Sequence, residues 1–278
     1  MRPDRTLPAS RDAFDELIDE YRDRIEGRLG IFLGRPKPNG FDIVYTVRPD
    51  ERFTSASMIK VPVLWTLYDC YDGCLDDLTT PNGIAEANRV DGSGVFHLLA
   101  DLNPSLEDLA RAMIAISDNT ATNELIDHLG CETVTERMHE LGLTETRLGR
   151  KMMVTDEGEG DLPPDALENL ISPRDVAMLF ADIHRGETLS RRAYERLRVP
   201  LRHQKDTSMF ARYRPLDHRM EHKTGWLSTA ALDAGVCHAG NDPLVYAVFL
   251  DGMDHGGDGT DVIAEIGDAV HTWLRSQE

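Results

Sequence analysis

The sequence has few lysines, few cysteines and no long apolar run. Only five of its 278 residues are lysine. No apolar stretch approaches the about 20 residues needed to cross a bilayer. The first residues, MRPDRTLPASRDAFDELIDEY, also lack the apolar core of a secretory signal. We therefore expect no membrane partner. The chain as written is expected to be cytoplasmic, or periplasmic or secreted if a leader was trimmed.

Positive charge is also scarce. Lysine and arginine total 30 residues against 49 aspartates and glutamates, which gives a net charge of −19. A surface this acidic repels nucleic acid and anionic lipid, and the sequence shows no local basic patch. We therefore expect a small-molecule partner and no nucleic acid.

The four cysteines form no metal-binding motif. Cys70 and Cys74 are spaced i, i+4, whereas Cys131 and Cys237 stand apart, and the four form no Cys-x-x-Cys pair. We interpret all four as buried free thiols. The acidic run DGMDHGGDGTD lacks the ligand alternation of a calcium loop. We therefore predict no metal site and no organic cofactor.

The order of the predicted elements indicates an α+β fold. A helix and two strands open the chain, helices fill its middle, and two strands and a helix close it. We expect the two ends to meet in one antiparallel sheet with flanking helices, into which an all-α domain is inserted. Residues 11–50 and 200–275 are assigned to the α/β part and residues 51–199 to the all-α part of one unit, residues 11–275. A ligand site is expected in the cleft between the parts.

Ser57-Met58-Ile59-Lys60 is the sharpest chemical feature. Serine needs a base to act as a nucleophile. Residues i and i+3 share a helix face, so the Lys60 amine can reach the Ser57 hydroxyl. Burial or a second cation lowers the pKa of lysine, and a neutral Lys60 can accept the Ser57 proton. Taken alone, this pair also occurs by chance.

Two further triplets have both structural and chemical interpretations. Ser117-Asp118-Asn119 fits a helix end that runs into the next N-cap, or a hydroxyl and an amide presented to a cleft. Lys223-Thr224-Gly225, just before a predicted strand, fits a solvated turn, or an anion site where glycine permits close backbone approach. His222 is interpreted as a surface strand residue.

In this order the three motifs resemble those of the class A-like serine β-lactamases, within the superfamily that also holds the penicillin-binding proteins. The separations, 60 residues from Ser57 to Ser117 and 106 from Ser117 to Lys223, are similar to those of that family. The segments FTSASMIKVPVL, LEDLARAMIAISDNTATNELID and HKTGW also look family-like. The resemblance covers roughly residues 11–275 and implies the two-part fold outlined above.

The resemblance implies a catalytic role for three residues. Ser57 would attack the substrate carbonyl and become acylated. Lys60 would be its base or part of the proton path. Ser117 would pass a proton to the departing nitrogen. No metal or organic cofactor takes part in this scheme.

The resemblance also implies a set of substrate-binding residues. Asn119 would bind the substrate's side-chain amide and hold Lys60. Lys223 and Thr224 would hold a substrate carboxylate, beside Gly225. The backbone N–H groups of Ser57 and Trp226 would form the oxyanion hole. The expected ligand is a β-lactam-like or peptide-like carboxylate bound by a monomer.

One position departs from the family pattern. In class A enzymes a segment resembling Thr146-Arg147-Leu148-Gly149-Arg150-Lys151 leads to the glutamate that activates the deacylating water, and here the next residue is Met152. The Glu-x-x-Leu-Asn signature is absent. We expect a carboxylate of the following loop to substitute, and we favour Glu157 and Glu168 because glutamate reaches further than aspartate.

Three functions follow as hypotheses. The first is a class A-like serine β-lactamase that hydrolyses the β-lactam amide through an acyl-Ser57 intermediate. The second is a penicillin-binding-type peptidase or esterase of the same fold that deacylates slowly, which Met152 supports. The third is a non-catalytic binding protein, and the presence of Ser57 together with Lys60 argues against it.

Overall fold

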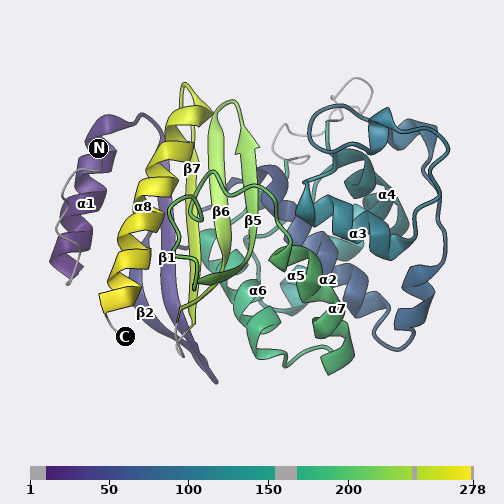
Figure 1. The fold of residues 1–278 in the computed structure, drawn as a ribbon, viewed down its shortest axis with the longest axis horizontal. Coiled ribbons are helices and arrows are strands. Elements are labelled where there is room, and N and C mark those ends of the chain that lie inside the picture. Colours follow the sequence, from purple (N-terminus) through teal and green to yellow (C-terminus); the bar gives the residue numbers. More distant parts are fainter. Residues whose placement is uncertain (1–10, 154–167, 240–242, 277–278) are drawn as a thin grey trace.

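The computed structural model describes residues 11–153, 168–239 and 243–276. Its centre is a five-stranded antiparallel sheet with the strand order β2-β1-β7-β6-β5 (Figure 1). The strands come from both ends of the chain: β1 (Arg28–Lys37), β2 (Gly40–Val47), β5 (Arg219–Leu227), β6 (Ala230–His238) and β7 (Leu244–Asp251). The predicted meeting of the two ends in one sheet is confirmed.

Helices cover both faces of this sheet. α1 (Arg11–Arg24) and α8 (Gly256–Ser276) lie on one face, as Figure 1 shows. α6 (Pro173–Arg185) packs against β1, β6 and β7 on the other. Because successive side chains point to opposite faces, β6 sends Leu232 to one apolar core and Cys237 to the other. β6 and β7, which have a neighbouring strand on each side, are therefore almost completely buried.

The helical half is built around α2 (Lys60–Cys70). Nine of its eleven residues are buried, so α2 is a core helix without a solvent-facing stripe. The helices packed around it are α3 (Leu106–Ala115), α4 (Asn119–Leu129), α5 (Cys131–Glu140) and α7 (Arg191–Arg202). The short connections are η1 (Ala56–Ile59), η2 (Leu75–Thr79), η3 (Glu86–Asn88) and η4 (Phe96–Leu98), with a two-stranded ladder of β3 (Phe53–Thr54) and β4 (Leu170–Ile171).

The predicted α+β class is confirmed, and α3 begins after its N-cap residue Ser105. The Ser105 side chain accepts from Asp108 N at 3.1 Å, and the Asp108 carboxylate accepts from Ser105 N at 3.2 Å, which is a complete capping box. The boundary at residue 199 stays a prediction. α6 lies within the segment assigned to the all-α part, yet it packs on the sheet.

Two details of the prediction were wrong. Lys223-Thr224-Gly225 does not precede a strand but lies inside β5, whose alternation the polar residues His222 and Thr224 had concealed. Cys70 and Cys74 are exposed rather than buried, because they lie at and just beyond the C-terminal end of α2.

Among the helices that the structure describes, none has the length and apolar composition of a membrane span.

Candidate active site

Ser57 and Lys60 lie at the N-terminal end of the buried helix α2. Ser57 is in the single turn of η1, where it is half-buried, and Lys60 is the first residue of α2, fully buried. Ala56 has φ +44°, so the chain enters this turn in a left-handed conformation. The local structure therefore places the hydroxyl at the edge of the core and the amine inside it.

The Lys-Thr-Gly motif, on the edge strand β5, lies directly against this turn. A Cβ on Gly225 would lie 3.2 Å from the Met58 nitrogen and 3.3 Å from the Ser55 carbonyl oxygen, closer than ordinary contact. A side chain at position 225 would push β5 and the nucleophile turn apart by a few tenths of an ångström, so glycine favours their close approach. The three sequence motifs meet here, although they are far apart in the chain.

Lys60 is held by the second motif. Its Nζ donates to the Ser117 carbonyl oxygen at 2.7 Å, to Ser117 Oγ at 3.1 Å and to Asn119 Oδ1 at 2.8 Å. These three acceptors satisfy all the donors of an ammonium group. They also aim the amine at the hydroxyl of Ser117, which the resemblance had placed in the proton path.

Lys223 reaches the same hydroxyl from the sheet. Its Nζ donates to Ser117 Oγ at 3.2 Å and to the Thr224 carbonyl oxygen at 2.6 Å. Ser117 Oγ thus lies between the amines of Lys60 and Lys223. Two cationic side chains that converge on one hydroxyl cannot both keep their proton at low cost in a buried site.

The pKa values of both lysines follow from this arrangement. Burial lowers the pKa of Lys60 well below its usual value, the charge of Lys223 lowers it further, and the Asp118 carboxylate opposes both effects. Burial also lowers the pKa of Lys223, to about 8, against the raising effects of Asp206 and Asp233. A lowered pKa suits a Lys60 amine that accepts a proton, and a pKa of about 8 leaves Lys223 able to attract an anion at neutral pH.

The Ser117 turn is strained and is braced by its neighbours. Ser117 has φ +57°, a conformation that few residues other than glycine and asparagine adopt readily. Asp118 caps α4 by accepting from Ala121 N at 2.8 Å and also accepts from Val95 N at 2.7 Å and Phe96 N at 2.9 Å. The buried carboxylate of Asp118 therefore holds the loop that presents Ser117.

The substrate-binding residues lie around this centre. Asn119 Nδ2 donates to the Asp91 carbonyl oxygen at 3.2 Å, so both ends of its amide are engaged. Thr224 is buried, whereas Trp226 is 55% exposed at the solvent end of the motif. Trp226 is therefore free to line an open site rather than the core.

Sequence reasoning missed Asp206, which faces the third motif. Burial by itself raises the pKa of Asp206, but hydrogen bonds from Ser208 and Thr224 and the charge of Lys223 lower it overall. The Asp206 carboxylate therefore partly neutralises the positive charge of Lys223. Asp206 follows the helix that ends at Arg202, and nothing in the local pattern marks it, because its partners come from a different part of the chain.

Met152 is held in place by a second residue that the sequence did not indicate. Met152 N donates to Asn123 Oδ1 at 2.7 Å, and Asn123 Nδ2 donates to the Met152 carbonyl oxygen at 3.1 Å. The Met152 side chain is only 9% exposed and belongs to the core of the helical half. An apolar side chain therefore occupies the position at which the resemblance predicts a carboxylate.

The side-chain amide of Asn169 binds the backbone of Gly149 and Arg150, and so connects the chain before residue 154 with the chain after residue 167. Asn169 Oδ1 accepts from Gly149 N at 2.8 Å and Arg150 N at 3.0 Å, and its Nδ2 donates to the Arg150 carbonyl oxygen at 3.0 Å. Ser55 N in turn donates to the Asn169 carbonyl oxygen at 2.8 Å. The loop base is thereby attached to the segment that carries Ser57.

The two favoured deacylation bases remain predictions. Glu157 lies outside the described residues. Glu168 is exposed, and its backbone oxygen accepts from Arg147 Nε at 3.3 Å. Among the hydrogen bonds of the described residues, none joins an Asp or Glu side chain to Ser57, Lys60 or Ser117.

His222 is not the surface residue that was expected. It is 3% exposed, and its Nδ1 lies 3.1 Å from Asp233 Oδ1 on β6. Asp233 also accepts from the Tyr246 hydroxyl at 2.8 Å and from Phe210 N at 3.1 Å. The face of β5 opposite Lys223 therefore packs on a buried polar group, which supports the strand from behind.

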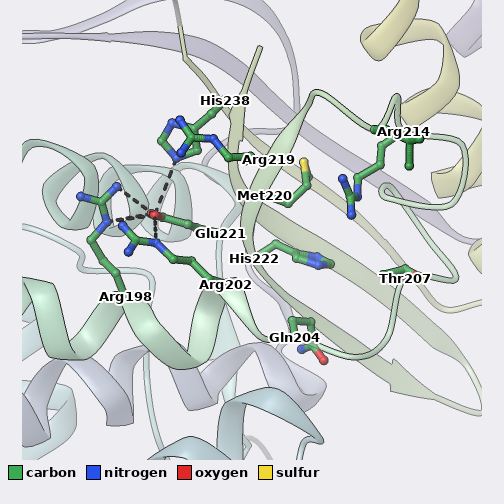
Figure 2. Close-up of a pocket in the computed structure, with 11 residues that line it drawn as sticks. Arg198, Arg202, Gln204, Thr207, Arg214, Arg219, Met220, Glu221, His222 and His238 are labelled. Carbon is green, nitrogen blue, oxygen red and sulfur yellow. Dashed lines mark hydrogen bonds and ion pairs between the residues drawn. The ribbon is translucent and has the colours of Figure 1, made fainter. Parts of the chain in front are cut away.

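A basic cavity of about 500 Å³ lies beside the first half of β5 (Figure 2). Arg198, Arg202, Arg214 and Arg219 line it, so a local basic patch does exist in this acidic chain. Glu221 lies between two of them, 2.8 Å from both Arg198 Nη2 and Arg202 Nε. The sequence concealed this patch because its arginines lie on a helix, a loop and a strand.

Comparisons with known proteins agree with this geometry. The profile of the β-lactamase enzyme family matches residues 12–274. A β-lactamase of Rhodobacter capsulatus is 30% identical over 191 residues, which are 68% of this chain and 64% of that protein. The chain thus aligns with somewhat less than two thirds of that relative.

Solved structures match nearly the whole chain. The crystal structure of a β-lactamase from Sphaerobacter thermophilus has a TM-score of 0.82 at 30% identity and covers 94% of this chain and 96% of its own. PBP-A has a TM-score of 0.82 at 24% identity and covers 98% of this chain and all of its own, a likeness of fold. The family match over residues 12–274 and the shared fold show that this chain belongs to the β-lactamase enzyme family.

Proposed function

We propose that the protein is a class A-like serine hydrolase that opens the amide of a β-lactam through an acyl-Ser57 intermediate. The observation that carries this proposal is the position of Ser117 Oγ between Nζ of Lys60 and Nζ of Lys223, at 3.1 and 3.2 Å. A binding protein gains nothing from a buried lysine of lowered pKa that contacts the Ser117 hydroxyl and lies three residues from Ser57. A hydrolase needs such a base.

Acylation in this proposal uses neutral Lys60 as the base. Lys60 Nζ takes the proton of Ser57 as Oγ bonds to the carbonyl carbon. The backbone N–H groups of Ser57 and Trp226 stabilise the resulting oxyanion, an interaction typically worth about 3–4 kcal/mol per donor. The carbon–nitrogen bond then breaks, and Ser117 gives its proton to the leaving nitrogen while it regains one from Lys60.

Substrate binding in this proposal depends on Lys223. Below its pKa of about 8 the side chain is an ammonium group. A carboxylate next to Lys223 and Thr224 places the amide near Ser57, because β5 touches the nucleophile turn at Gly225. Asn119 binds the amide of the substrate side chain, and it already holds Lys60.

A penicillin-binding-type enzyme that releases its acyl group slowly is the second candidate. The observation in its favour is Met152, whose backbone Asn123 clamps and whose side chain is apolar. Without a carboxylate there, water has no base beside the acyl-serine unless the loop of residues 154–167 or Glu168 supplies one. The two candidates share acylation and differ only in deacylation.

Time-resolved intact mass separates the candidates. The protein is mixed with benzylpenicillin, its mass is followed, and hydrolysed product is measured optically, with Ser57→Ala in parallel. Multiple turnovers that depend on Ser57 support the β-lactamase. A persistent adduct without turnover supports the slowly deacylating enzyme. Neither adduct nor turnover contradicts both β-lactam candidates.

A further inference from the structure

Three potential metal ligands meet in the core behind the sheet, although they are far apart in the sequence. His218 precedes β5, Cys237 lies on β6 and His271 on α8. Their exposed fractions are 1%, 0% and 1%. The two Nδ1 atoms are 3.0 Å apart, and Cys237 Sγ lies 3.9 Å from that of His218 and 3.7 Å from that of His271.

These distances match the size of a transition-metal ion. Protein zinc sites have metal–nitrogen distances of about 2.0–2.1 Å and metal–sulfur distances of about 2.3 Å. A cation about 2.0 Å from both Nδ1 atoms, in the plane of the three donors, would lie about 2.2 Å from Sγ. Shifts of the donor atoms by a few tenths of an ångström bring all three metal–ligand distances to their usual values.

One of the two histidines is already oriented for ligation. His271 Nε2 lies 3.2 Å from the Phe210 carbonyl oxygen, and because a carbonyl only accepts, Nε2 carries the proton. The Nδ1 lone pair of His271 therefore points toward Cys237 and His218. Such a bond to a backbone carbonyl is the usual support behind a metal-bound histidine.

The environment favours the neutral imidazole that ligation requires. Burial, together with the nearby His218, Arg214 and His222, lowers the pKa of His271 to about 3, although the hydrogen bond to the Phe210 carbonyl oxygen raises it. Burial raises the pKa of the Cys237 thiol to about 12, and Arg214 alone opposes this effect. The thiol must lose its proton to bind a cation, so binding would release one proton to solvent.

We propose that His218, Cys237 and His271 bind one thiophilic cation, Zn²⁺ or Cu⁺. One thiolate and two imidazoles in a closed, apolar surrounding suit these two ions better than Mg²⁺ or Ca²⁺, which prefer oxygen ligands. The site is separate from the Ser57 centre and does not rest on the proposed function. On binding, the proton of the thiol passes to solvent, and the single proton of His218 moves from Nδ1, where it donates to His271 Nδ1, to Nε2.

The cation would be structural. It would join the segment before β5 to β6 and to α8, and His218 lies five residues before Lys223. The start of the strand that carries Lys223 would then be tied to the far face of the sheet. Removal of the metal is therefore expected to lower the melting temperature more than it changes the adduct formed at Ser57.

The test uses the full chain, expressed in media supplemented with Zn²⁺ or with Cu²⁺, so that the metal is present during folding. Metal content is measured by elemental mass spectrometry after gel filtration in a weak chelator. About one ion per chain is expected, and the medium that loads the protein identifies the ion. Chains from both media without metal would overturn the proposal.

A matched set of thiol variants checks the ligands. Cys70→Ser/Cys74→Ser/Cys131→Ser removes the exposed and half-buried thiols and is expected to retain the metal. Cys237→Ser is expected to lower the affinity by more than the about 10–100-fold that second-shell changes cost. Equal metal content in Cys237→Ser would overturn the proposal.

A spectroscopic readout covers the case in which Cys237→Ser does not fold. Co²⁺ bound to the triple variant, in which Cys237 is the only thiol, is expected to show a thiolate-to-cobalt charge-transfer band. Absence of that band in the folded triple variant would also contradict ligation by Cys237.

Discussion

Asn123 holds the backbone of Met152 at both of its polar groups, with 2.7 Å from Met152 N to Oδ1 and 3.1 Å from Nδ2 to the Met152 carbonyl oxygen. Asn123 binds only main-chain atoms of Met152, so these two hydrogen bonds do not depend on the side chain at position 152. The side chain at position 152 can therefore change while its backbone stays hydrogen-bonded to Asn123 of α4. In the proposed function this separates acylation, which is assigned to Ser57 and its partners, from deacylation, which is assigned to the residue at position 152.

Met152→Glu is expected to accelerate deacylation. A carboxylate on the clamped backbone supplies a general base, an effect typically worth about 10²–10⁴-fold. The lifetime of the benzylpenicillin adduct, measured by intact mass, should shorten accordingly. Met152→Gln is the control, since it keeps a similar shape without a base. Equal adduct lifetimes for the two variants would contradict a role for this position in deacylation.

Ser117→Ala and Ser117→Gly are expected to slow acylation equally, by about 10²–10⁴-fold, because both remove the hydroxyl between the two lysines. They should differ in stability. The φ of +57° suits glycine, so the glycine variant should be the more stable by up to about 1 kcal/mol in the free energy of unfolding. Urea denaturation and adduct formation measure the two effects separately, and unchanged acylation in both variants would remove Ser117 from the proton path.

The acylation rate is expected to depend on pH through Lys223. Lys223 is protonated below its pKa of about 8, and it loses its charge as the pH rises through that value. Attraction of a substrate carboxylate is therefore present at lower pH, and kcat/KM should fall up to about tenfold per pH unit above 8.

Lys223→Arg provides the control for this pH profile. Arginine stays charged throughout the accessible range, so the alkaline fall should disappear in this variant, whatever its absolute rate. If the fall persists at the same pH in Lys223→Arg, another group causes it.

Glu221→Gln is expected to destabilise the fold. Figure 2 shows the Glu221 carboxylate between Arg198 and Arg202, with His238 above it. Burial alone raises the pKa of Glu221, but these three partners lower it to about 2. Removal of the charge leaves the partly buried Arg198 and the exposed Arg202 without their shared partner, and because water screens Arg202 the cost should fall below the about 3–5 kcal/mol typical of a fully buried pair.

The same carboxylate gives a pH dependence of stability. Because its pKa is lowered on folding, its contribution is complete above the ordinary value of 4.5 and is lost as the pH falls toward about 2. Thermal melts between pH 6 and pH 2 should show a steeper loss for the wild type than for Glu221→Gln. Glu145→Gln, at an exposed ion pair, is the control and should behave like the wild type.

The local parts of the candidate site could be predicted from the sequence. Ser57 and Lys60 are three residues apart at the start of a helix, so periodicity alone places them together. The capping box at Ser105 and the helix positions depend on neighbours within four residues. His222 and the strand around Lys223 were harder, because their burial depends on Asp233 of the adjacent strand.

By itself the sequence determined which side chains are available and the order in which they occur: Ser-x-x-Lys, Ser-Asp-Asn, Lys-Thr-Gly, and methionine at position 152. The tertiary structure decided the distances and charges. Only packing brings Ser117 between Lys60 and Lys223 and removes water from both amines, which lowers their pKa values. The meeting of His218, Cys237 and His271 has the same origin. Local periodicity reaches a few residues along the chain, whereas contacts across the fold depend on how the sheet and helices close around a common core.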